Sequence, residues 1–218
     1  MNLIERIKLY KKLFSEKKFS QIINEIENFE TNKTSQIINI LGVCKMMKKN
    51  KSKEDLISAN HNFKEAYLKE KNSLYGLEAL VNFINVSTDL GEFEDSIVFY
   101  KEAEKNFGYN EKLLKAISRN YQFSIRKDER IKVLERIINN KTKSLDVWCS
   151  YMYINNFQYN FDQTKHFKIA KQFSNQIKDY GLENLTLDTN ITKRKKILGF
   201  LSSDLNKKHS ITYFLKGL

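Results

Sequence analysis

Proline is absent from the sequence, and glycine and cysteine are scarce, with seven and two copies in 218 residues. Average usage of ~5% would place about ten prolines in a chain of this length. Since the chain is also rich in Asn, Lys and Ile, a compositional bias accounts for the missing proline. Cys44 and Cys149 lie far apart in apolar helical settings, so we expect two buried, reduced thiols rather than a disulfide.

Long apolar runs are lacking as well. No stretch approaches the ~18 consecutive apolar residues of a transmembrane helix. The first eight residues already include Glu5, Arg6 and Lys8, which is not the pattern of a secretory signal. With 41% apolar and 12% aromatic residues, the chain nevertheless has the composition of a folded protein. We therefore expect a folded cytoplasmic protein without a membrane partner.

Motifs of the common metal-binding and catalytic classes are also missing. His61 and His166 have no Cys or His nearby at metal-ligand spacing, so we expect no metal site. The sequence contains no phosphate-binding loop and no G-x-S-x-G turn. Carboxylate pairs such as Glu54–Asp55 and Glu94–Asp95 are typical of the first turn of a helix, where the helix dipole favours negative charge.

Positive charge is in excess, with a formal net charge of +12. A basic adaptor for nucleic acid is one interpretation, and a steep salt dependence of binding would support it. The other interpretation is that lysine fills solvated helix faces, because acidic residues are interspersed with it almost everywhere. The densest basic run is Lys193–Lys196, and no recognition motif accompanies it. Nucleic acid is therefore not the favoured partner.

The range Leu90–Ala103 indicates a helical repeat. A glycine in a turn is followed by Ser96, by the aromatic Tyr100 four residues later and by Ala103 three residues further on. Small residues allow two helices to approach closely, and the aromatic side chain fills the space toward the next repeat. This segment resembles the turn and second helix of a tetratricopeptide repeat, and the first helix carries Leu80, Phe83 and Ile84 on one face.

Weaker copies of the pattern occur at a spacing close to 34 residues, which is the period of this repeat. One copy has a turn at Lys49–Asp55 that is longer than standard, and another has Arg130 where alanine is usual. A further degenerate unit opens with Trp148 and Tyr151. The paired apolar positions of these copies are Leu9, Leu13, Ile22, Ile26 and Phe29; Ile38, Leu41, Gly42, Ala59, Phe63 and Ala66; and Leu114, Ile117, Tyr121, Ile131, Leu134 and Ile137.

Stacked helix pairs form a superhelix whose concave groove suits an extended partner, so the repeats predict binding rather than chemistry. A helical bundle without repeats is the alternative, because amphipathic spacing alone would serve both. The sequence leaves open whether such an array forms a homodimer.

The last part of the sequence reads differently. Lys196–Asp204 has the pattern of a short buried β-strand that runs into a turn of small residues. Ile211, Phe214 and Leu215 then have the spacing of a helix. One strand and one helix cannot bury each other's apolar faces, so we expect the opening of a larger α/β domain.

Together, the repeats and this last segment resemble bacterial members of the O-GlcNAc transferase/SPINDLY family, in which tetratricopeptide repeats precede a two-lobed glycosyltransferase. The first catalytic strand of that family typically reads Arg-Ile-Gly-Tyr-Val-Ser-Ser-Asp-Phe, and a His and an apolar helix come after it. Ile197–Leu205 matches the strand, His209 matches the His, and Phe214–Leu215 matches the helix. The range from Trp148 to Ala170 resembles the connector of the family.

The resemblance implies a parent enzyme that transfers a sugar from a UDP-GlcNAc-like nucleotide donor to Ser or Thr hydroxyls of a protein acceptor. It implies that His209 lies near donor and acceptor, where an imidazole can handle protons. Asp204 lies at the carboxyl end of the strand, where α/β sites form, although a turn and helix N-cap is the simpler interpretation. His209 follows Asp204 by five residues, where the family usually has four.

Relatives line their groove with an asparagine ladder for the acceptor backbone, and the resemblance places Asn82 at that position in the best repeat. Lys8, Ile40 and Ala116 occupy the position in the other copies, so such a ladder would be incomplete.

We therefore expect an all-α, tetratricopeptide-like solenoid at 1–144 with about four repeats, a degenerate repeat or helical connector at 145–192, and an incomplete Rossmann-like lobe at 193–218. The lobe that would hold the donor is missing, so this chain alone is expected to bind no cofactor and to be inactive. The alternative function is a non-catalytic scaffold that binds a peptide or protein in its groove.

Overall fold

The computed structural model describes residues 3–29, 33–157 and 162–178. Every regular element in these ranges is an α-helix, and there are ten of them. The predicted strand at Lys196–Asp204, together with Asp204 and His209, lies outside the described residues. The helices are α1 (Leu3–Ser15), α2 (Phe19–Phe29), α3 (Ser35–Met47), α4 (Lys53–Lys69), α5 (Leu74–Leu90), α6 (Phe93–Phe107), α7 (Glu111–Phe123), α8 (Lys127–Asn139), α9 (Leu145–Asn155) and α10 (Gln163–Lys178).

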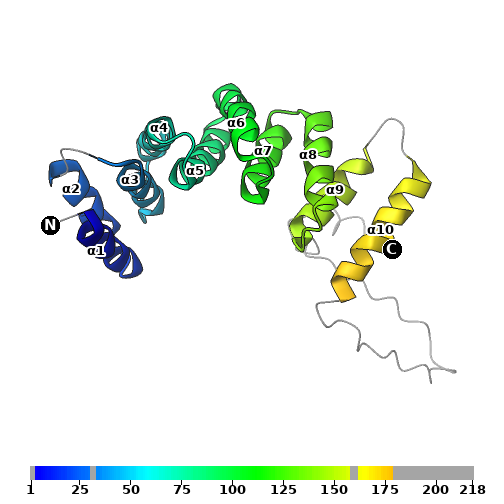
Figure 1. Cartoon of the computed structure of the whole chain (residues 1–218), viewed down its shortest axis with the longest axis horizontal. Coiled ribbons are helices and arrows are strands. Elements are labelled where there is room, and N and C mark those ends of the chain that lie inside the picture. The colour runs from blue at the N-terminus through cyan, green and yellow to red at the C-terminus, as the bar shows by residue number, and fades with distance from the viewer. Residues whose placement is uncertain (1–2, 30–32, 158–161, 179–218) are drawn as a thin grey trace, which may run out of the picture. The chain divides into compact units, whose positions relative to one another are not determined.

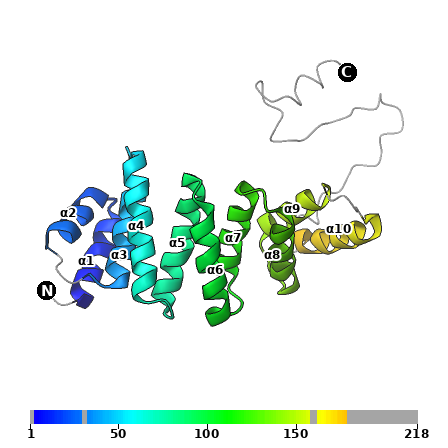
Figure 2. The same ribbon diagram turned by 90° about the horizontal axis from the view of Figure 1, so that it is seen from above.

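The helices form a row of hairpins, each made of an odd-numbered helix and the next helix in the chain (Figures 1 and 2). Helix α3 packs on α4 and on α5, and α5 packs in turn on α6 and α7. Each hairpin thus contacts its neighbours in sequence. In Figure 1, α3, α5 and α7 lie along one side of this row and α4, α6 and α8 along the other. The helix pairs expected from the sequence are all present in the described residues, which supports a helical solenoid.

The α5–α6 hairpin is built as its sequence predicts. Ser73 caps α5 by accepting a hydrogen bond from the backbone of Gly76 at 3.0 Å. Gly91 ends the helix in the left-handed region at φ 79°, a conformation that glycine adopts without steric cost. On α6, Ser96 and Ala103 are fully buried. These small residues let the two helices approach closely.

The α3–α4 hairpin has the longer turn that the sequence predicts, at residues 48–52. Ser52 and Asp55 form a reciprocal capping box at the start of α4, and Lys48 donates to the Asp55 carboxylate at 2.8 Å. Within the hairpin, Gly42 faces Phe63 so closely that an added Cβ would lie 2.6 Å from the ring. Glycine is required here because the aromatic ring occupies the space of a side chain.

The apolar interior divides into two clusters. The larger runs from α3 to α10 and includes Phe63, Leu80 and Trp148. The smaller lies around α1, α2 and one face of α3, where Cys44 is fully buried. Helix α3 therefore belongs to both clusters and joins the first hairpin to the rest. The expectation of two buried thiols was wrong for Cys149, which is exposed on α9.

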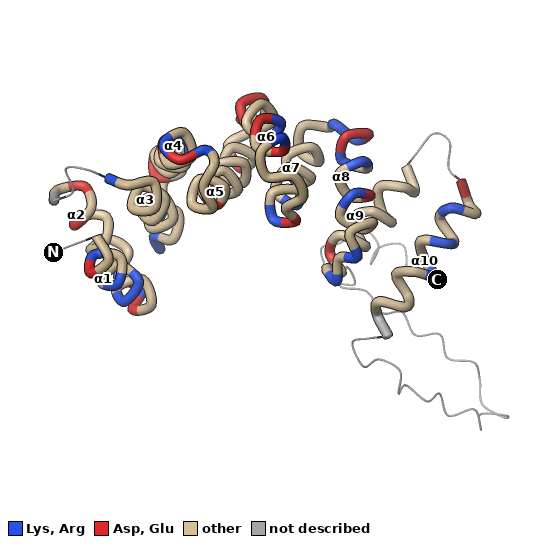
Figure 3. Tube along the Cα trace, in the orientation of Figure 1, with Lys and Arg blue, Asp and Glu red and all other residues tan. Residues whose placement is uncertain are grey.

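Charged residues of both signs are interspersed along the helices, as Figure 3 shows for α6 and α8. Many of them pair across neighbouring hairpins, about one repeat apart in sequence. These pairs are Lys64–Asp95, Lys71–Glu102, Arg119–Asp89, Arg126–Glu94, Arg136–Glu104 and Lys165–Glu135. Part of the positive charge thus ties successive repeats together.

Candidate functional site

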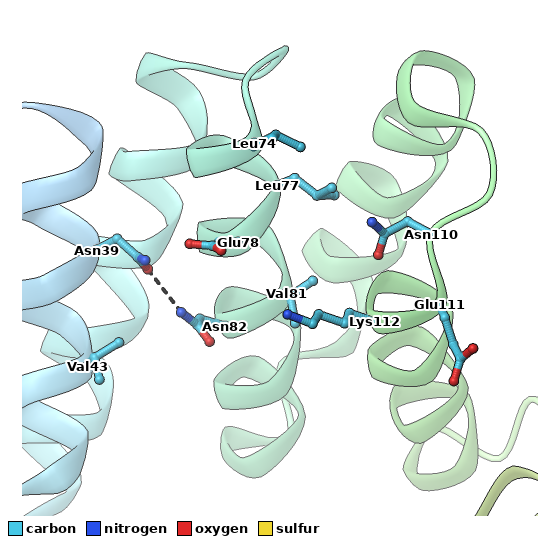
Figure 4. Close-up of a pocket in the computed structure, with 10 residues that line it drawn as sticks. All are labelled: Asn39, Val43, Leu74, Leu77, Glu78, Val81, Asn82, Asn110, Glu111 and Lys112. Carbon is cyan, nitrogen blue, oxygen red and sulfur yellow. Dashed lines mark hydrogen bonds between the residues drawn. The ribbon is translucent and has the colours of Figure 1, made fainter. Parts of the chain in front are cut away.

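A groove lies across three odd-numbered helices, α3, α5 and the start of α7 (Figure 4). It encloses a hollow of about 580 Å³, and its lining mixes apolar side chains with amides and charges. The lining residues are Asn39 and Val43 from α3; Leu74, Leu77, Glu78, Val81 and Asn82 from α5; and Asn110, Glu111 and Lys112 around the start of α7.

Asn82 lies in the middle of this groove. Its Nδ2 donates a hydrogen bond of 3.0 Å to the side-chain oxygen of Asn39 on the neighbouring α3, and Figure 4 shows the two amides meeting between the helices. Each amide has two donor hydrogens and one acceptor oxygen. After this bond, the Nδ2 group of Asn39 and the Oδ1 atom of Asn82 remain to bond another molecule.

Asn39 was missed by the sequence analysis, which assigned the equivalent position in α3 to its neighbour Ile40. Ile40 instead packs against the small apolar cluster around α1 and α2. The separation between Asn39 and Asn82 is 43 residues, and both the longer turn before α4 and the 17-residue length of α4 contribute to it. At the corresponding place in α7, Ala116 is buried, so the amide pair does not continue there. Lys8, on α1, is likewise not among the residues that line the groove.

The end of the groove at α7 is polar. Asn110 caps the helix by accepting a hydrogen bond from the backbone N–H of Leu113 at 3.0 Å. Glu111 forms an ion pair with Lys115 at 3.3 Å and accepts a hydrogen bond from Thr142 at 2.9 Å. Its carboxylate is therefore held by the protein itself, and Lys112 supplies the accessible charge at this end.

Buried polar bonds between hairpins hold the helices behind the groove. Asn60 of α4 accepts a hydrogen bond from Ser87 of α5 and donates one to Glu92 in the next turn, each at 3.0 Å. One hairpin further on, Asn120 of α7 donates to Thr88 of α5 at 3.3 Å. Because a buried amide is costly to leave unpaired, these bonds specify the register of successive hairpins.

Residues suited to acid–base or metal chemistry do not gather in the described part of the chain. No group of three or more His, Cys, Asp or Glu side chains there is placed to hold a metal ion. Burial raises the pKa of Tyr67 to about 12 and also raises the pKa of Tyr100 and Tyr151, which moves these phenols further from ionisation at neutral pH. The proposed catalytic residues Asp204 and His209 lie outside the described residues.

No helix in the described ranges combines the length and apolar character needed to cross a membrane.

Comparison with known proteins gives no relative from which to transfer a function. No protein-family model matches the sequence, and no curated protein matches it.

Proposed function

We propose that the hairpin array binds an extended polypeptide segment in the groove formed by α3, α5 and α7. The observation that carries this proposal is the bond between Asn82 and Asn39, which leaves one amide donor and one amide acceptor for a ligand. Each residue of an extended peptide presents its own N–H and C=O on the same edge. The amide pair offers complementary groups to such an edge, whatever the side chains of the peptide.

The surroundings of the amide pair support this assignment. Leu74 is 74% exposed at the start of α5, and Val43 and Val81 are partly buried beside the asparagines. Apolar patches flanking a few placed polar groups are typical of binding sites. A peptide could therefore bury side chains against these residues while its backbone bonds the amides.

The experiment compares two asparagine pairs. A phage-displayed library of random decapeptides is selected on the purified chain and on the variant N39A/N82A. The control variant N72A/N106A removes a second asparagine pair, bonded at 3.0 Å and exposed, that does not line the groove. We expect enrichment on the wild type and on N72A/N106A, and its loss on N39A/N82A. Equal enrichment on all three proteins, or enrichment on none, would contradict peptide binding in this groove.

We further propose that this array presents a protein acceptor to a glycosyltransferase of the O-GlcNAc transferase/SPINDLY type. Support comes from the match of Ile197–Leu205 and His209 to the first catalytic strand of that family and from the hairpin array that precedes it. In that setting Asn82 contacts the acceptor backbone, Asp204 and His209 lie at the reaction centre, and the donor is a UDP-GlcNAc-like nucleotide sugar.

The intact mass of the protein purified from its native cells tests this second proposal. We expect a species several hundred residues heavier than 25.8 kDa, because donor binding requires a further lobe. The 218-residue chain alone should release no UDP from UDP-GlcNAc. A native mass of 25.8 kDa would contradict the transferase and leave a peptide-binding scaffold.

A further inference from the structure

Two charges in the groove have no partner among the described residues. Glu78 of α5 and Lys112 of α7 both line the groove and are exposed, and neither forms an ion pair or hydrogen bond with another described residue. In Figure 4 the Glu78 carboxylate points to the α3 side of α5, whereas the Lys112 side chain extends from α7 toward α5. The two charges of opposite sign thus lie on opposite sides of α5 within one groove.

Lys112 is also placed against the preference of its helix. It lies in the first turn of α7, where the aligned peptide dipoles create a positive potential that disfavours a lysine. The neighbouring Glu111 shares the first turn, where its carboxylate also forms an ion pair with Lys115 and accepts a hydrogen bond from Thr142. The ammonium group extends away from the start of this helix and places a positive charge, unpaired among the described residues, on the α7 side of α5.

The α3 side of α5 has the opposite character. Glu78 lies beside the bonded amides of Asn39 and Asn82, with no basic residue among the groove-lining residues of α3 and α5. A carboxylate in this position attracts a cationic side chain. Complementary potentials of this kind fix the register of a bound partner more than they add affinity.

We propose that the groove selects a polypeptide segment that carries a basic and an acidic side chain two to four residues apart, the basic group beside Glu78 and the acidic group beside Lys112. The two charges lie on opposite sides of α5, a helix with its side chains is about 10 Å across, and an extended chain advances about 3.3 Å per residue, which gives this spacing. The inference rests on peptide binding in the groove and adds the charge pattern and register of the ligand.

The test exchanges the two charges. The double variant E78K/K112E keeps the net charge of the protein, so long-range attraction of peptides stays the same. Random decapeptides are selected on the wild-type chain and on this variant. We expect the wild type to enrich peptides with the two charges in one order along the chain and the variant to enrich the reverse order. A synthetic peptide from the wild-type selection should bind E78Q and K112Q about two- to fivefold more weakly each, the range for partly exposed charge pairs.

A matched control exchanges two other charges. Glu65 of α4 and Lys101 of α6 are exposed and outside the groove, so E65K/K101E should keep the preference of the wild type. The same charge order on wild type and E78K/K112E would overturn the inference. Peptides enriched without any charge preference, with enrichment lost in N39A/N82A, would also overturn the inference. That result would still support peptide binding in the groove. Failure of every protein to enrich peptides would contradict both proposals.

Discussion

The α3–α4 and α7–α8 hairpins are both helix pairs of the row, but they fill the space between their helices differently. In α3–α4, Gly42 leaves room for the Phe63 ring, and Ala59 on the facing helix is fully buried. In α7–α8, the corresponding positions hold Ser118 and Arg130, both buried. In α3–α4 the Phe63 ring fills the space left by Gly42, whereas α7–α8 buries the long cationic side chain of Arg130.

This difference shows how far the residues between two paired helices can vary from one hairpin to another. The buried Arg130 Nε has no hydrogen-bond partner among the described residues, and burial lowers the pKa of its guanidinium. A charged group in such a position costs free energy unless it is paired. We therefore expect the stability of α3–α4 to depend on the fit between Gly42 and the Phe63 ring. The stability of α7–α8 should instead tolerate, and even gain from, the replacement of Arg130.

The largest effect is expected from removing the central side chain of each hairpin. Phe63→Ala should lower the free energy of unfolding by about 3–5 kcal/mol, and Leu134→Ala at the equivalent place in α8 by about 2–4 kcal/mol. Both side chains are almost completely buried. Urea titration measures the losses, with Leu68→Ala, on the exposed side of α4, as a control that should change little. A smaller loss for Phe63 than for Leu134 would contradict the comparison.

The next effect is the added methyl group of Gly42→Ala. Its Cβ would lie 2.6 Å from the Phe63 ring, and overpacking of this kind costs about 1–3 kcal/mol. In the Phe63→Ala background the clash is absent, and alanine should then stabilise the helix by up to about 1 kcal/mol relative to glycine. A double-mutant cycle in urea tests this change of sign. Ser118→Ala in α7 is the matched control, because serine already has a Cβ.

A gain in stability is expected from Arg130→Met. Methionine keeps most of the buried stem and removes the unpaired charge, so the free energy of unfolding should rise by about 1 kcal/mol. Lys132→Met, at an exposed position on the same helix, should have no comparable effect. A loss of stability in R130M would mean that the guanidinium has a partner that stabilises it.

The smallest effect concerns the start of α4, which has a capping box, whereas Arg126 at the start of α8 makes no side-chain cap. Hydrogen bonds from Lys48 and from the Ser52 backbone lower the pKa of Asp55. Its stabilising contribution is therefore present above the unfolded-state pKa of ~3.9 and is lost as the pH falls through the lower folded-state pKa.

Asp55→Asn should accordingly cost about 0.5–1 kcal/mol at pH 7, and the difference from the wild type should shrink at acid pH. Chemical unfolding at a series of pH values measures it. Asp128→Asn in the first turn of α8, which has no such box, should show a smaller difference. An Asp55→Asn difference that stays constant down to about pH 3, below the unfolded-state pKa, would contradict the role of the ionised carboxylate.

The sequence predicted the hairpins well because the apolar spacing and the small residues that define them occur within a short segment, as at Ser96 and Ala103. It assigned the position equivalent to Asn82 to Ile40 and so missed Asn39 by one residue, because apolar spacing does not fix which neighbouring side chain of α3 turns toward α5. Lys112 carried no signal of its own. A lysine on a helix surface is common, and only the meeting of α5 and α7 places it in a groove.

The division of the interior at α3 makes Cys44 a built-in reporter of motion in the first hairpin. Burial raises the pKa of its thiol to about 12, so the closed protein resists alkylation. If α1 and α2 detach while the larger cluster stays folded, the thiol becomes reactive, and its labelling rate then measures the free energy of that opening. Exposed Cys149 would react at once, so the measurement needs the variant C149S. Opening of the α1–α2 hairpin can thus be followed in the native state, separately from global unfolding.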